Sequence, residues 1–131
     1  MQANHFLGVL GARTGDLPPV VDVEDGDAPF NADELKLFID AVEAAVGVKP
    51  IIYTGSWYWP GGVSWAKHYM LWEAEYNHTG EGEPTISGDW ADWTFWQFTN
   101  QGTGATYGAS SQHIDLNVFN GTLQELEDLA A

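Results

Sequence analysis

Two helices are predicted in the first part of the chain from apolar residues spaced three and four positions apart. The first ends at Gly11 and carries one apolar stripe: Ala3, Phe6, Leu7 and Leu10. The second runs from Asn31, a good N-cap, to Gly47, a good terminator, and has Glu34 in its first turn. Its stripe is expected to be buried: Leu35, Phe38, Ile39, Val42 and Val46.

Short apolar runs between and after these helices predict strands. Five such runs occur, at 17–24, 49–55, 69–76, 93–99 and 113–119. A last helix follows, with Thr122 and Glu125 spaced as a capping box. Strand, helix and strand in this order favour an α/β fold in which mostly parallel strands are covered by helices. The loop 77–89, rich in Gly and polar residues, is the segment expected to be most flexible.

Composition narrows the class of protein. The chain has 131 residues, and we expect a single domain over residues 1–131. Its formal net charge of −15 argues against binding to nucleic acid or to an anionic membrane through a basic face. No signal peptide is recognisable at the start, no run approaches the length of a membrane span, and without cysteines no disulfide can form.

The strand at 17–24 ends in carboxylates, which burial would penalise. Asp22 and Glu24, two residues apart, share one face of a strand, with Cα atoms roughly 6.6 Å apart. A glycosidic bond is cleaved by such a pair, one carboxyl donating a proton and the other stabilising or attacking the oxocarbenium-like centre. The alternative is that these acids only cap the next helix, and we favour that interpretation for Asp25 and Asp27.

The later strands carry aromatic and amide side chains suited to a sugar site. They are Tyr53, Trp72, Tyr76, Gln97, Asp115 and Asn117. Aromatic rings stack on pyranose faces, whereas amides and carboxylates bind hydroxyl and acetamido groups. Taken singly, Trp72 and Trp96 could equally be core residues. The four histidines are scattered without zinc-ligand spacing, so no metal or other cofactor is predicted.

Four segments occur together and in order: "LPPVVDVED", "KPIIYTGSWYW", "YMLWEAEY" and "WTFWQFT...HIDLNVF". With them the chain resembles glycoside hydrolase family 25, the Chalaropsis-type lysozymes. The resemblance implies a β/α barrel and cleavage of the β-1,4 bond between N-acetylmuramic acid and N-acetylglucosamine in bacterial peptidoglycan. By motif, Glu24 resembles the proton donor, Asp22 its stabilising partner and Asp115 a late-strand acid of the cleft. The residues expected to line the sugar subsites are Tyr53, Trp72, Tyr76 and Gln97.

The sequence departs from the family pattern in two places. The early strands of the family, with a "D-V-S-x-x-Q-G" segment and a further aspartate, have no counterpart here, so we expect an incomplete barrel of about five strands. Glu73 stands where the family usually has an apolar residue, and it is expected to face solvent or an unusual neighbour.

Several functional alternatives stay open at this point. The chain is expected to act on the cell wall after secretion or phage release, either as a muramidase or as a truncated fragment that only binds peptidoglycan or serves in assembly. The spacing of Asp22 and Glu24 is compatible with a retaining, inverting or acetamido-assisted reaction. Unpaired strand edges predict self-association or pairing with a separate amino-terminal piece.

Overall fold

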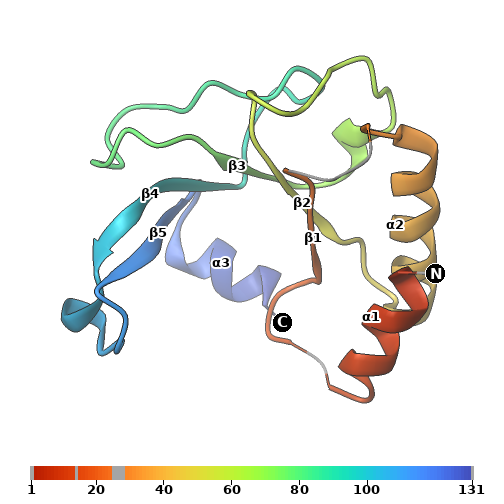
Figure 1. Cartoon of the computed structure of the whole chain (residues 1–131), viewed down its shortest axis with the longest axis horizontal. Helices are drawn as coiled ribbons and strands as arrows, with labels where there is room; N and C mark the ends of the chain where they lie inside the picture. The colour runs from red at the N-terminus through yellow and green to blue at the C-terminus, as the bar shows by residue number, and fades with distance from the viewer. Residues whose placement is uncertain (1, 14, 25–28, 131) are drawn as a thin grey trace.

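A single five-stranded sheet organises the computed structural model, which describes residues 2–13, 15–24 and 29–130 (Figure 1). The strand order is the chain order: β1 (Val20–Asp22), β2 (Ile51–Thr54), β3 (Leu71–Ala74), β4 (Phe95–Thr103) and β5 (His113–Phe119). Within the described residues the sheet does not close, because β1 and β5 form its two edges. The fold is therefore an open sheet of the kind expected for an incomplete barrel.

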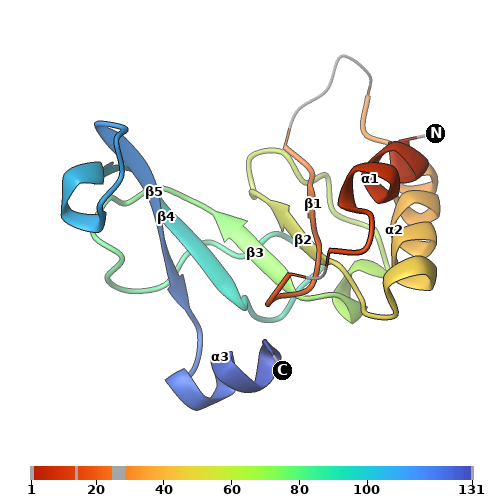
Figure 2. The same cartoon turned by 90° about the horizontal axis from the view of Figure 1, so that it is seen from below.

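The first four strands are parallel and the fifth is not. β1 to β4 pair in parallel, whereas β5 pairs with β4 in the antiparallel sense. β4 and β5 are joined through the short helix η2 (Gly104–Tyr107), and this hairpin extends away from the rest of the sheet (Figure 2). The predicted site residues of β5, Asp115 and Asn117, therefore lie within the strand and not at its carboxyl end.

All three predicted helices are present and have the predicted ends. They are α1 (Gln2–Leu10), α2 (Ala32–Val46) and α3 (Leu123–Leu129). The Asn31 side chain accepts hydrogen bonds from two backbone amides at the start of α2, and Gly47 adopts a left-handed conformation with φ 85° at its end. Thr122 and Glu125 form the expected capping box. The helices show no segment, within the described residues, that is long and apolar enough to cross a membrane.

The main hydrophobic core lies on one face of the sheet. Val21, Ile52 and Leu71 are aligned by the strand register and are all buried. Val21 and Ile52 pack with Ile39 of α2 and with residues from the segment between β2 and β3, which includes the short helix η1 (Ala66–His68). α1 lies beside α2 (Figures 1 and 2), with the rings of Phe6 and Phe38 6.3 Å apart.

The register places the predicted site residues on the opposite face. Asp22 is aligned with Tyr53, and Tyr53 with Trp72, so these three side chains share that face. Ala74 is aligned with Gln97, and Gln97 with Asn117. Helix α2 and its core cover the other face, which leaves this one open to carry polar chemistry.

Candidate active site

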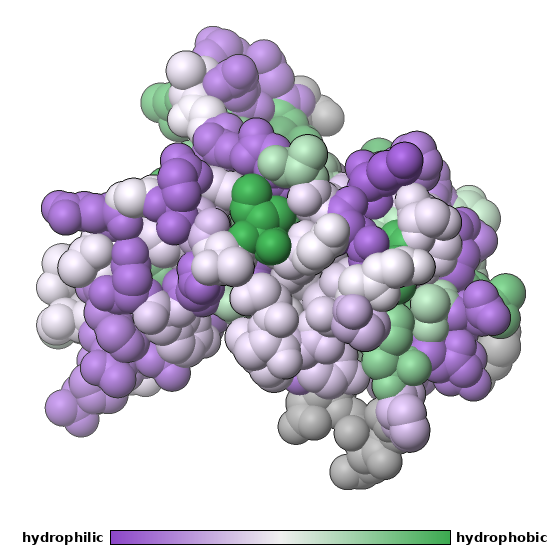
Figure 3. Space-filling model, turned by 90° about the horizontal axis from the view of Figure 1, so that it is seen from above, coloured by the Kyte–Doolittle hydropathy of each residue, from purple (hydrophilic) through white to green (hydrophobic). Residues whose placement is uncertain are grey.

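The site lies at the carboxyl ends of β1 to β3, where the chain leaves the sheet. Asp22 is the last residue of β1, and Glu24 follows two residues later with its backbone still near β2, since Val23 donates an amide hydrogen bond to the Tyr53 carbonyl. β1 runs toward the top of the molecule in Figure 1, and Figure 3 looks onto that end. The surface there is mostly hydrophilic or intermediate, with only small hydrophobic patches.

The two carboxyl groups of the predicted pair interact directly. Burial raises the pKa of Asp22, and a hydrogen bond with the Glu24 side chain partly opposes that rise. A hydrogen bond that lowers a carboxyl pKa is one that stabilises its ionised form. The side chains of Asp22 and Glu24 are therefore hydrogen-bond partners.

Tyr53, Tyr76 and Gln97 form a second group, which we term the tyrosine–amide cluster. The Gln97 Oε1 atom accepts hydrogen bonds from the hydroxyls of Tyr53 at 2.8 Å and Tyr76 at 2.7 Å. Gln97 itself is buried. The two phenols are thus held by one amide, on the face of the sheet that carries Asp22.

Carboxylates at the end of β1 and on β5 act on these phenols. Burial raises the pKa of Tyr53, and the nearby Glu24, Asp22 and Asp115 carboxylates raise it further. The pKa of Tyr76 is also raised, by burial first and then by Asp115. Asp115, predicted only as a late-strand acid, therefore lies in the same electrostatic field as Asp22 and Glu24. Both phenols stay protonated and remain hydrogen-bond donors.

The structure places Trp72 and Trp96 differently, although from the sequence either could have been a core residue. The Trp72 indole is half-buried on the site face, where its Nε1 donates to Asn117 Oδ1 at 2.8 Å and its ring meets Tyr53 edge-on at 5.7 Å. Trp96 is fully buried in the core. All eight predicted site residues thus lie on one face or at its rim, whereas Asp25 and Asp27 fall outside the described residues.

A hollow of about 230 Å³ lies next to Glu24. It is lined by Glu24, Trp57, Ala74, Glu75 and Tyr76. Two of these, Trp57 and Glu75, were not among the predicted site residues. Trp57 could have been found, because it lies two residues after the predicted strand at 49–55. Glu75 alternates with Trp72 and Tyr76 along its strand, so the pattern placed it on the opposite face and gave no signal.

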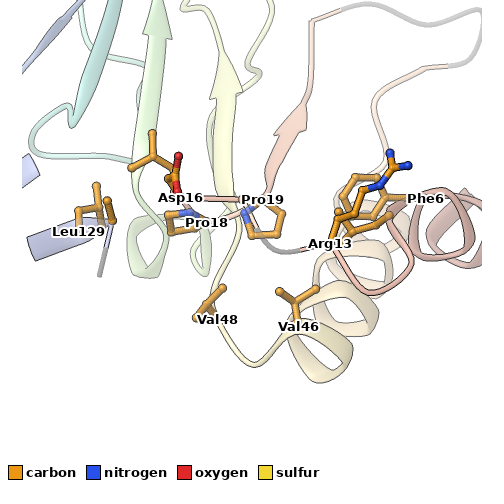
Figure 4. Close-up of a pocket in the computed structure, with 12 residues that line it drawn as sticks. Phe6, Arg13, Asp16, Pro18, Pro19, Val46, Val48 and Leu129 are labelled. Atoms are coloured by element: carbon orange, nitrogen blue, oxygen red, sulfur yellow. The ribbon is translucent and has the colours of Figure 1, made fainter. Parts of the chain in front are cut away.

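A larger hollow, of about 530 Å³, lies at the other end of the sheet (Figure 4). Its walls come from α1, the segment before β1, the end of α2 and the end of α3, and they are mostly apolar side chains such as Phe6, Pro18 and Val48. Among the described residues that line it, Asp16 is the single one with a carboxylate side chain. This hollow lacks a carboxyl pair and is not the candidate active site.

Glu73 is buried, so of the two expected alternatives, solvent or an unusual neighbour, the structure shows the second. It points to the core side of β3, where its carboxylate accepts hydrogen bonds from the Ser56 amide at 2.8 Å and from the Ser87 amide and hydroxyl at 2.9 and 2.8 Å. Burial raises the pKa of Glu73, and these hydrogen bonds oppose the rise. The carboxylate joins the loop after β2 to the loop 77–89, which was expected to be flexible.

Across residues 2–13, 15–24 and 29–130, no three histidine or acidic side chains are grouped so that they could hold a metal ion. The chemistry available at the site is that of carboxyl groups, phenols, amides and indoles.

Comparison with known proteins identifies the family. Residues 1–106 match the sequence profile described as "Glycosyl hydrolases family 25". The chain belongs to this family. The family 25 glycosyl hydrolase of Bacillus anthracis has the same fold, with a TM-score of 0.76 and 31% sequence identity over 99% of this chain and 62% of that one.

Two relatives align with nearly the whole chain. The uncharacterized protein YegX of Escherichia coli (strain K12) is 33% identical over 97% of this chain and 45% of its own length. Lysozyme M1 of Streptomyces globisporus is 30% identical over 98% of this chain and 47% of its own length. This family 25 chain therefore spans about half the length of these curated relatives.

Proposed function

We propose that this family 25 chain is a muramidase, a glycoside hydrolase that cleaves the β-1,4 bond between N-acetylmuramic acid and N-acetylglucosamine in bacterial peptidoglycan. The observation that carries the proposal is the hydrogen-bonded pair of Asp22 and Glu24. This pair lies beside aromatic and amide side chains that can bind sugars. Membership of a glycosyl hydrolase family and the similarity to lysozyme M1 support the same reaction.

Glu24 is assigned the general acid. A protonated Glu24 donates its proton to the glycosidic oxygen of the leaving sugar as the bond to the anomeric carbon breaks. Asp22, as the ionised partner, stabilises the positive charge that develops at that carbon or orients the substrate's own acetamido group. Water then supplies the hydroxyl group of the new reducing end, and its proton returns to the carboxyl pair.

The remaining residues are assigned to substrate binding. The Tyr53 and Tyr76 hydroxyls, held by Gln97, present fixed polar groups beside the carboxyl pair. Trp72, held by Asn117, presents an aromatic surface for a sugar ring. Asp115 adds negative charge, which favours a positively charged transition state over a neutral substrate.

A second candidate function is binding without cleavage. It is favoured by one observation, namely that the chain spans about half the length of its relatives while the aromatic and amide side chains are all in place. Such a module would hold peptidoglycan through Trp72 and Tyr76 and release no product. The two functions therefore differ in a directly measurable way.

The test is product analysis on purified, insoluble peptidoglycan. The chain is incubated with the wall polymer, and new reducing ends are tagged by borohydride reduction and identified by mass spectrometry. A muramidase generates new ends that carry N-acetylmuramic acid. Sedimentation of the chain with the polymer but no new ends would favour the binding module, and ends that carry N-acetylglucosamine would contradict the assigned bond.

A further inference from the structure

Trp57 is a large aromatic side chain left on the surface beside the carboxyl pair. Its exposed fraction is 64%, although an indole of this size is normally well buried. It lines the same hollow as Glu24, together with Ala74 and Tyr76. Tyr76, itself 43% exposed, supplies a second aromatic wall of this hollow. The hollow is thus aromatic on two sides and is also lined by two acidic residues, Glu24 and Glu75.

The Trp57 indole is held in place by the backbone beneath it. A Cβ atom at Gly55 would lie 2.1 Å from Nε1 of Trp57 and 2.9 Å from the Ala74 carbonyl oxygen, so the indole rests directly on Gly55. Any other residue at this position would displace the ring. The neighbouring Tyr58 ring lies 5.8 Å away, centroid to centroid.

The turn that carries Trp57 is fixed on both sides. Before it, the Ser56 amide donates to the buried Glu73 carboxylate. After it, the amides of Tyr58 and Trp59 both donate to the Gly55 carbonyl at 2.9 Å. An exposed aromatic ring on a turn held this way loses little conformational freedom on binding a ligand.

We propose that Trp57 is a stacking platform for one sugar ring of the glycan strand, at the rim of the hollow next to Glu24. The inference rests on the proposed function and adds a binding residue to it. The apolar face of a pyranose ring is its complement, and Tyr76 faces the same bound sugar from the other wall. Glu73 acts as a positioning residue, because it holds the backbone from which Trp57 projects.

The test uses chitotetraose, an oligomer of N-acetylglucosamine, as the probe, with binding measured by titration calorimetry. We expect Trp57→Ala to weaken binding about tenfold, equivalent to about 1.4 kcal/mol, while Trp57→Phe keeps most of the affinity. The matched control is Tyr107→Ala, since Tyr107 is also 64% exposed but lies on η2, away from the site. This control should bind as the parent does.

Hydrolysis of soluble peptidoglycan fragments gives a second, separate readout. Because a stacking contact binds the substrate and the transition state about equally, Trp57→Ala should raise KM with kcat nearly unchanged. Equal chitotetraose affinity in the parent and Trp57→Ala, or no binding by the parent, would overturn the inference. If the parent binds in a Trp57-dependent way but hydrolyses nothing, the inference stands and the muramidase assignment fails. Thermal unfolding confirms that the variants are folded, and Trp57→Phe provides the test if the alanine variant is not.

Discussion

The hydroxyl of Tyr53 donates a 2.8 Å hydrogen bond to Gln97 Oε1, across 44 positions of the chain. The two residues lie on β2 and β4, with β3 between them. Tyr76 donates to the same oxygen from the segment after β3. The Gln97 amide oxygen on β4 therefore binds one hydroxyl from β2 and one from the segment after β3.

This shared acceptor predicts coupling between the two tyrosines. Tyr53→Phe or Tyr76→Phe alone removes one donor and should lower the free energy of unfolding by about 1 kcal/mol, because the other phenol still satisfies the oxygen. The double substitution leaves the buried Gln97 oxygen without either phenol, so its cost should exceed the sum of the single costs by roughly 1 kcal/mol or more. Urea unfolding of the four proteins measures this difference.

Tyr107→Phe serves as the control for the loss of a phenol hydroxyl. Its side chain is exposed on η2, so the substitution should leave the free energy of unfolding nearly unchanged. Strictly additive costs for the Tyr53 and Tyr76 substitutions would contradict a shared acceptor.

Glu73 predicts a pH dependence of stability. Because burial raises its folded pKa above the ordinary value of 4.5, the folded protein binds this proton more tightly than the unfolded chain. The resulting stability is present below that value and is lost as the pH rises from it through the raised pKa. Glu73→Gln should therefore flatten the fall in urea midpoint across this range.

The comparison for Glu73 is Glu127→Gln on the exposed surface of α3. This substitution removes an exposed carboxyl and leaves the buried one in place. The urea midpoint of this variant should therefore fall with pH as steeply as that of the parent. A Glu73→Gln variant with the slope of the parent would mean that this carboxyl does not titrate differently in the folded state.

The formal net charge of −15 predicts how wall binding depends on solution conditions. Bacterial wall polymers are often anionic, so added salt or mild acid should strengthen binding by screening or neutralising the repulsion. Co-sedimentation of Glu24→Gln with purified walls measures this without cleavage. Chitin, an uncharged glycan, is the control and should show little salt dependence, and flat binding to walls under all conditions would refute the prediction.

The open sheet predicts association through its edges. β1 and β5 each have one unpaired side within the described residues, and Val20 on β1 is 38% exposed. Unpaired edges are sites at which a strand from another chain can add. Light scattering should therefore show an average mass that rises with concentration. The mass of a single chain at every concentration, with cooperative unfolding, would argue against this association.

Much of the fold was predictable because local signals agreed with the final structure. Helix α2 has its predicted cap at Asn31, its terminator at Gly47 and buried Ile39 and Val42 on the predicted stripe. The sharing of one face by the predicted site residues was also predictable, because alternation along a strand fixes which side chains point the same way. Asp22 and Trp72 lie on the same face of the sheet for this reason.

What the sequence could not predict depends on contacts between distant segments. The antiparallel direction of β5 is set by its pairing with β4. The alternation of side chains along a strand is the same whether the strand is parallel or antiparallel to its neighbour. The burial of Glu73 depends on Ser56 and Ser87, which approach it from two different loops. Trp57 is recognisable as a site residue only once its turn is seen to lie beside Glu24.

The most direct test of the account is the release of reducing ends from purified peptidoglycan by the parent chain and by Glu24→Gln. Glu127→Gln, the same substitution on the exposed surface of α3, is the matched control. We expect release by the parent and the control, and a loss of about a hundredfold or more in Glu24→Gln, because the general acid is gone. Equal release by Glu24→Gln and the parent would contradict the assignment of Glu24 as the proton donor.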